Sequence, residues 1–94
     1  MTGSILIVDD EKGQRDILSA ILGKEGYRVL AVPGGREALQ ELERSEFDLL
    51  LTDLKMQGMS GMELMERVLS ESPKQCVVMM TAHGTLDTVK TAIK

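Results

Sequence analysis

Three short apolar runs, each ending abruptly at a polar side chain, constrain this chain more than any other feature of its sequence. The runs are Ser4–Val8, Phe47–Thr52 and Cys76–Met80. The residues that follow them are Asp9, Asp10 and Glu11, then Asp53, then Thr81. Continuous runs rich in valine, isoleucine and leucine, without polar alternation, are typical of strands buried on both faces, as in a parallel sheet.

Amphipathic stretches separate these runs, together with a second short strand expected at Arg28–Ala31. Helical spacing of apolar residues predicts helices over about 14–22, 36–44, 62–69 and 86–93. In the first we expect Ile17, Leu18, Ile21 and Leu22 to form the apolar face. In the third we expect Met62, Met65, Val68 and Leu69 to form the apolar face, with Leu64 on its flank. Four strand–helix units predict an α/β fold, an open parallel sheet with helices on both faces and right-handed crossovers.

Length and composition exclude several classes of protein. Ninety-four residues support one hydrophobic core and one domain. No apolar run approaches the roughly 20 residues that cross a bilayer, so we expect no membrane contact. A net charge of −4, with one tyrosine and one phenylalanine, argues against direct binding of nucleic acid. The single cysteine, Cys76, excludes an internal disulfide and fits a reducing, cytoplasmic location.

The carboxylates at the strand ends suit a divalent cation. Ligands of open parallel sheets bind outside the carboxyl ends of the strands, where Asp9, Asp10 and Asp53 are expected to converge. Oxygen-only ligands favour a hard ion such as Mg²⁺, held by one or two carboxylates, waters and a substrate phosphate. The alternative is that Asp9, Asp10 and Glu11 only cap the following helix, since acids stabilise a helix N-terminus.

Three stretches resemble the receiver domain of bacterial response regulators. They read ILIVDDE from Ile5, DLLLTDLKMQGMSGMEL from Asp48 and VVMMTAHG from Val77. The resemblance runs from about residue 4 to the C-terminus, and the second and third stretches are most similar to receivers of the nitrogen-regulator type. It implies a flavodoxin-like (CheY-like) fold and a parent protein that controls transcription through an output domain.

The resemblance also implies a chemistry for individual residues. Asp53 would accept a phosphoryl group from a histidine of a sensor kinase. Asp10 and Asp53 would bind Mg²⁺ with the backbone carbonyl of Lys55, and Asp9 would act through a bound water. Such a domain catalyses only its own phosphorylation and dephosphorylation.

Two further positions follow from the same resemblance. Thr81 would hydrogen-bond a phosphoryl oxygen and so bias the active conformation. Lys55 and His83 would line the approach to Asp53 and tune how fast the acyl phosphate hydrolyses. As lone residues, a solvated lysine and a loop histidine are the simpler alternatives.

The sequence departs from the family pattern at two places. Gln57 stands where the family usually has proline, in the loop after Asp53. The chain also stops at Lys94, before the family's fifth strand and the lysine that this strand carries, so we interpret residues 1–94 as a C-terminally truncated receiver.

Truncation motivates a second hypothesis, that of a self-associating structural module without signalling competence. An apolar fourth strand left at the sheet edge would pair with another chain, by edge pairing or exchange of the terminal helix. A metal-dependent hydrolase is a third possibility, but the sequence shows no general base other than Asp53.

Overall fold

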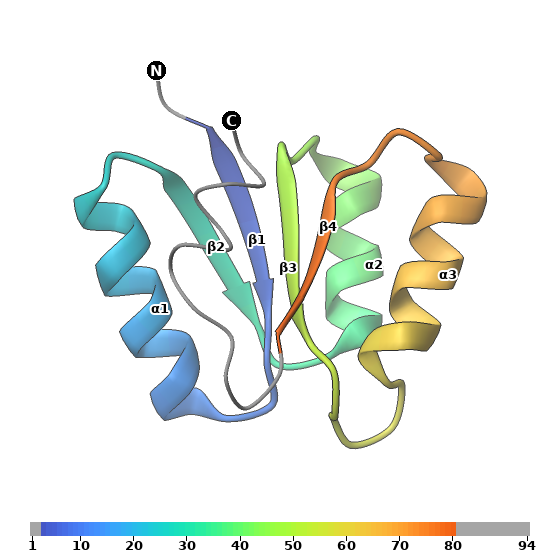
Figure 1. The fold of residues 1–94 in the computed structure, drawn as a ribbon, viewed down its shortest axis with the longest axis horizontal. Coiled ribbons are helices and arrows are strands. Elements are labelled where there is room, and N and C mark those ends of the chain that lie inside the picture. Colours follow the sequence, from blue (N-terminus) through green and yellow to red (C-terminus); the bar gives the residue numbers. More distant parts are fainter. Residues whose placement is uncertain (1–2, 81–94) are drawn as a thin grey trace.

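The computed structural model describes residues 3–80, which form a four-stranded parallel sheet with helices on both faces (Figure 1). The elements in chain order are β1 (Ser4–Val8), α1 (Lys12–Lys24), β2 (Arg28–Val32), α2 (Gly35–Arg44), β3 (Leu49–Asp53), α3 (Gly61–Glu71) and β4 (Val77–Met80). The strand order is β2-β1-β3-β4, which confirms the predicted fold class. The helix expected near 86–93 lies outside the described residues. None of the helices within 3–80 is long and apolar enough to span a membrane.

Strand β1 lies inside the sheet, between β2 and β3. It is parallel to both, with Ile5 opposite Val29 on one side and Leu49 on the other. Every side chain from Ile5 to Val8 has no exposed surface. An uninterrupted apolar run is therefore required here, because each side chain of β1 faces one of two hydrophobic layers.

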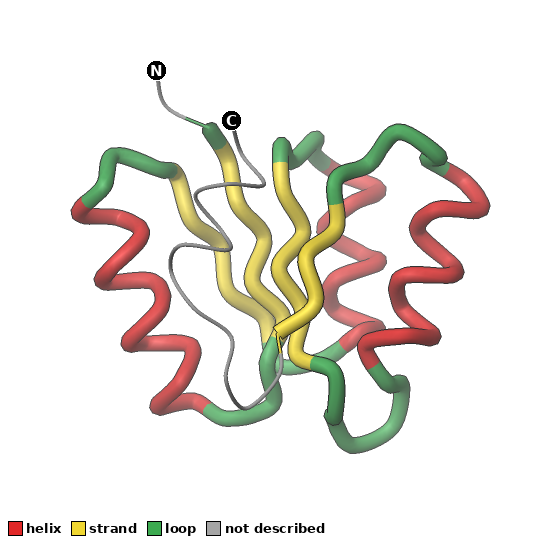
Figure 2. The backbone as a smooth tube through the Cα atoms, in the orientation of Figure 1, coloured by secondary structure: helices red, strands yellow, loops and turns green. Residues whose placement is uncertain are grey.

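Alternate residues of the strands supply the two layers. The layer on the α1 side contains Ile5, Ile7, Leu22, Leu49, Leu51 and Met80. The layer on the α2 and α3 side contains Leu6, Val8, Val32, Ala38, Leu50, Leu64 and Val68. Figure 2 shows α1 on one side of the strands and α2 with α3 on the other. The two-residue period of a strand explains why neighbours in sequence enter different layers.

A polar clamp holds the beginning of β1 against the segment that enters β3. The Asp48 carboxylate accepts hydrogen bonds from the Ser4 backbone N–H at 2.7 Å and from the Ser4 hydroxyl at 3.2 Å. The Ser4 hydroxyl oxygen in turn accepts from the backbone N–H of Asp48 at 3.2 Å. Together with the hydrogen bond from the Asp48 N–H to the Ser4 carbonyl at 2.9 Å, this clamp supports the β1–β3 register at its amino-terminal end.

Two details of the predicted helices are wrong. Leu64, expected on the flank of α3, is fully buried, whereas Met62 is 46% exposed. Ile17 of α1 is 56% exposed, and only Leu22 of that helix is fully buried. Helical spacing identifies an apolar stripe, but the rotation of each helix about its axis depends on what it packs against.

The first residue of α3 lies very close to the end of β3. Gly61 donates its N–H to the Leu54 carbonyl at 3.0 Å. A Cβ atom at Gly61 would overlap the backbone carbonyl oxygen of Asp53. The helix N-terminus is capped by Ser60, whose hydroxyl accepts from the Glu63 N–H at 3.2 Å. Only glycine lets α3 begin this close to the end of β3.

We expect Gly61→Ala to lower the free energy of unfolding by about 1–3 kcal/mol, because α3 or the end of β3 must shift to relieve the overlap. Urea unfolding followed by circular dichroism measures the effect. Gly23→Ala is the matched control, since a Cβ at that helical position meets nothing within 4 Å. The control should be neutral or stabilising by up to about 1 kcal/mol. Equal stability of both variants would contradict the steric explanation.

Candidate functional site

Three carboxylates from two strand ends meet at the carboxyl edge of the sheet. Asp9 and Asp10 follow β1, and Asp53 is the last residue of β3. One carboxylate oxygen from each lies within 4.8 Å of the other two. The β1–β3 register explains the meeting, because Val8 is opposite Thr52 and the next residues along are Asp9 and Asp53.

Asp9 is the buried member of the group, with 3% of its surface exposed. Its Oδ1 accepts a hydrogen bond from the Glu11 backbone N–H at 2.9 Å. Burial raises the pKa of the Asp9 carboxyl, the Glu11 N–H opposes that shift, and the charges of Asp53, Asp10 and Glu11 add to it. An ionised Asp9 is therefore at a disadvantage in the folded protein unless a cation compensates it.

Asp10 points to a different part of the chain. Its exposed carboxylate accepts a hydrogen bond at Oδ2 from the backbone N–H of Gln57, at 3.1 Å. Asp53 is half-buried, and the exposed Lys55 lies two residues further on. Glu11 precedes α1 without a side-chain cap, and the Asp10 carboxylate bonds to the other loop, so neither side chain caps the helix by a hydrogen bond.

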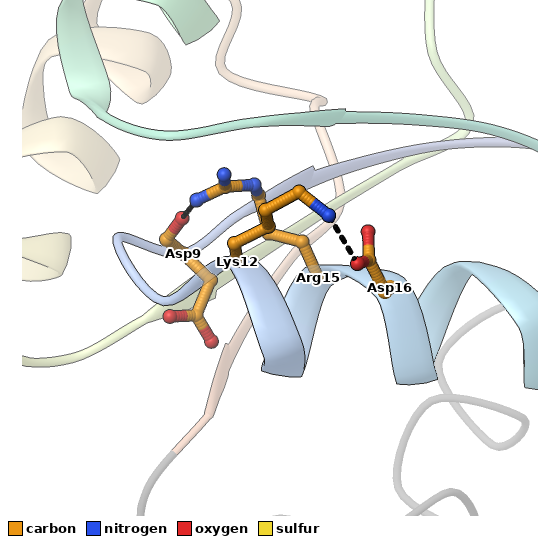
Figure 3. Close-up of polar contacts among 4 residues, drawn as sticks. All are labelled: Asp9, Lys12, Arg15 and Asp16. Atoms are coloured by element: carbon orange, nitrogen blue, oxygen red, sulfur yellow. Dashed lines mark hydrogen bonds and ion pairs between the residues drawn. The ribbon is translucent and has the colours of Figure 1, made fainter.

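The neighbouring cations do not neutralise this cluster. Arg15 donates from Nη1 to the backbone carbonyl of Asp9 at 2.8 Å, and Lys12 pairs with Asp16 at 2.7 Å (Figure 3). Within residues 3–80, no lysine or arginine forms an ion pair with any of the three clustered carboxylates. The three carboxylates are therefore not ion-paired, and Arg15 contacts the backbone carbonyl of Asp9 and not a carboxylate of the cluster.

This donor set fits Mg²⁺. Carboxylate oxygens are the ligands of hard divalent ions, and Mg²⁺ retains several waters when one or two carboxylates hold it. Asp10 and Asp53 are exposed enough to serve as direct ligands, whereas the buried Asp9 has one oxygen already engaged by the Glu11 N–H. Like charges held this close are a physical reason for a cation to bind.

A broad groove of about 1040 Å³ lies at the opposite edge of the sheet, between the ends of α2 and α3. Its charged side chains have both signs, as Arg28, Asp48, Glu71 and Lys74 illustrate. Within the described part of the chain, potential metal ligands converge at the carboxyl edge and not in this groove. We therefore take the acidic cluster as the functional site.

Two of the residues expected at this site, Thr81 and His83, lie outside the described residues. The strand end before them is in place, because Met80 of β4 is opposite Asp53. The sequence interpretation missed the contacts of Arg15 and of the Gln57 N–H. Arg15 lies one turn into a helix that follows an acidic loop, and this placement is a weak sequence signal for its contact with the Asp9 carbonyl. No residue-type pattern predicts the hydrogen bond from the Gln57 N–H to Asp10, because any residue except proline carries a backbone N–H.

Comparison with protein families matches residues 5–94 to the response regulator receiver domain. The chain is 38% identical over 90 residues to sporulation initiation phosphotransferase F of Bacillus subtilis, covering 96% of this chain and 73% of that protein. It is also 38% identical to the transcriptional regulatory protein ZraR of Klebsiella oxytoca, covering 96% of this chain but only 20% of that longer protein. Transcriptional regulatory protein GlrR of Escherichia coli gives 38% identity over 87% of this chain and 18% of its own length.

Solved structures show the same fold. The response regulator protein TrrA of Thermotoga maritima, determined in complex with Mg²⁺ and BeF, superposes with a TM-score of 0.83 at 32% identity, covering 86% of this chain and 70% of that one. The chemotaxis protein CheY4 of Vibrio cholerae superposes with a TM-score of 0.84 at 28% identity, covering 98% and 81%.

The raised pKa of Asp9 gives a stability prediction for the metal-free protein. Between the ordinary value of 3.8 and the raised folded value, the folded state binds more protons than the unfolded state. Stability therefore falls as pH rises through that window, and the loss persists at neutral pH. We expect Asp9→Asn to be more stable than the parent at neutral pH and to lose this advantage below the ordinary pKa.

Urea unfolding in chelator, across acid to neutral pH, measures this difference. Asparagine keeps the oxygen that accepts from the Glu11 N–H, so the variant removes charge and retains the hydrogen bond. Asp16→Asn, at an exposed position on α1, is the matched control and should show no comparable gain. An Asp9→Asn protein that is less stable than the parent at neutral pH would contradict the prediction.

Proposed function

Since the chain belongs to the family of response regulator receiver domains of two-component systems, we propose that Asp53 accepts a phosphoryl group from a histidine of a sensor kinase. The observation that carries the proposal is the convergence of Asp9, Asp10 and Asp53 within 4.8 Å at the carboxyl edge of the sheet. Asp53 is the half-buried member, at the end of a strand whose other residues are fully packed. A rigid strand end suits a nucleophile that must meet an incoming phosphorus atom in line.

In the proposed reaction, an Asp53 carboxylate oxygen attacks the phosphorus of the phosphohistidine. The new O–P bond forms an acyl phosphate, the P–N bond breaks, and its electron pair leaves with the imidazole nitrogen, which becomes protonated. A carboxylate nucleophile carries no proton that a general base would have to remove.

We propose Mg²⁺ as the cofactor of this transfer. Asp10, Asp53 and the backbone carbonyl of Lys55 would hold it, with Asp9 acting through a bound water. When bound, Mg²⁺ supplies the positive charge that stabilises the transferring phosphoryl group against the neighbouring carboxylates. The support is the all-oxygen donor set and the absence of ion-paired lysine or arginine at the cluster within residues 3–80. The complex of TrrA with Mg²⁺ and BeF agrees with this choice.

The remaining roles are likewise proposals. Thr81 would hydrogen-bond the phosphoryl group and so shift the domain towards its active conformation. His83 and the exposed Lys55 would set how fast water reaches the acyl phosphate. We propose residues 1–94 as a receiver unit that catalyses only its own phosphorylation and dephosphorylation.

The proposed partners are a sensor histidine kinase and an output domain. Two of the relatives are transcriptional regulatory proteins, of which this chain spans 20% and 18%. Control of transcription in the cytoplasm is the corresponding proposal for the parent protein, with DNA bound by the output domain and not by this acidic chain.

Incubation with a small phosphodonor and Mg²⁺ should add one phosphoryl group to the chain, and Asp53→Ala should abolish the addition. Intact-mass spectrometry measures the product, which should be lost in hydroxylamine as an acyl phosphate. Asp16→Ala is the matched control, because it removes an exposed α1 carboxylate whose ion pair contributes little. Labelling of Asp53→Ala, or labelling undiminished by chelator, would refute the proposal.

Self-association through β4 is the second candidate. Within residues 3–80, β4 pairs with β3 alone, and its residues Val77, Val78 and Met79 are only half-buried. A strand edge with apolar side chains is a template for pairing with another chain, either directly or by exchange of a terminal element.

We expect the unphosphorylated protein to form a dimer or higher oligomer at micromolar concentration, measured by light scattering. Asp53→Ala should associate equally, because the acidic cluster lies at the end of β3 and away from the outer edge of β4. A strictly monomeric species would rule out this candidate. Association that requires phosphorylation would instead point to signalling.

A further inference from the structure

One hydrogen bond joins the two loops that carry the acidic cluster. The backbone N–H of Gln57, in the loop between β3 and α3, donates to Asp10 Oδ2 at 3.1 Å. The two residues are 47 positions apart in the sequence. Gly58 follows with a φ of +80°, a conformation that glycine adopts without strain, and turns the chain back towards α3.

Backbone donors therefore hold both acids that follow β1. Asp9 has its Oδ1 engaged by the Glu11 N–H, and Asp10 has its Oδ2 engaged by the Gln57 N–H. Each carboxylate keeps its second oxygen for another ligand. Asp10 is exposed, so without this bond its side chain would sample several rotamers.

We propose that the Gln57 N–H is a positioning group that orients Asp10 for Mg²⁺ and couples the β3–α3 loop to cation binding. The inference rests on the proposed function, since it takes Asp10 as a cation ligand. The reason is general: a ligating carboxylate is held in place by outer hydrogen bonds, whose removal weakens metal binding. Here the outer donor belongs to the backbone of the loop that continues from Asp53.

The coupling must be reciprocal. If the hydrogen bond strengthens cation binding by some factor, cation binding strengthens the hydrogen bond by the same factor. Binding should therefore tighten the β3–α3 loop. A hydrogen bond that instead competed with the cation for Asp10 would break on binding and release the loop. The two models therefore predict opposite changes in the exchange rate of the Gln57 amide.

The variant pair Gln57→Pro and Gln57→Ala separates the backbone N–H from the side chain. Proline has no N–H to donate, whereas alanine retains it. With Mn²⁺ as the probe, measured by electron paramagnetic resonance of the free ion, we expect Gln57→Pro to bind about tenfold more weakly. Gln57→Ala should bind as the parent does. The loss lies at the lower end of the usual range of about 10- to 100-fold because Asp10 is exposed.

Proline also restricts the backbone of Met56, so a second measurement uses the unaltered protein. Amide hydrogen exchange at Gln57, followed by nuclear magnetic resonance, should slow when Mg²⁺ is added. Gly26, whose N–H donates to the Gly23 carbonyl in a distant turn, is the internal control and should not change.

The outcomes are distinguishable. Equal Mn²⁺ affinity of the proline and alanine variants, or faster Gln57 exchange in Mg²⁺, would overturn the positioning role while leaving the metal site intact. Failure of the parent protein to bind Mn²⁺ would overturn the proposed cation site itself. Weak binding by both variants would assign the effect to the glutamine side chain and also overturn the inference.

Discussion

The parallel pairing of β1 with β3 is the interaction on which the rest of this structure depends. Val8 lies opposite Thr52, so the residues that follow, Asp9 and Asp53, emerge side by side at the carboxyl edge. A slip of one residue would move every side chain of β1 to the other face of the sheet. Because Ile5–Val8 is fully buried on both faces, such a slip would disrupt both hydrophobic layers. Core packing therefore fixes the geometry of the acidic cluster.

The same pairing creates an electrostatic cost. Hydrophobic burial places three carboxylates within 4.8 Å, and both burial and like charge raise the pKa of Asp9. The surrounding chain reduces this cost with backbone dipoles, through the N–H groups of Glu11 and Gln57, and with the Arg15 guanidinium on a carbonyl. Those contacts use one carboxylate oxygen each of Asp9 and Asp10 and leave the other oxygen of each for a cation or water. A site of this kind is less stable empty than filled, which is how a cofactor can contribute to folding stability.

Much of this architecture could be predicted from local pattern. The boundaries of β1 agree with the run Ser4–Val8, and each expected helix within the described residues is present within a few residues of its predicted ends. Helix rotation was predicted less well. Met62 is exposed and Leu64 is buried in the layer with Leu6 and Val8, an arrangement that belongs to tertiary packing and leaves no periodic signal. Asp53 itself proved to be the last residue of β3 and not the first residue after it.

Local pattern was enough to predict acids at the ends of buried strands, because the apolar runs and the residues that follow them can be read from composition and spacing. The same pattern identified Asp9, Asp10 and Asp53 as candidate ligands of a divalent cation. The difference between them is visible only in the folded chain: the buried Asp9 accepts from the Glu11 N–H, while the exposed Asp10 accepts from the Gln57 N–H. Backbone N–H groups, which every residue but proline carries, make both contacts: the Glu11 N–H lies two residues from Asp9, whereas the Gln57 N–H comes from a loop 47 positions away from Asp10.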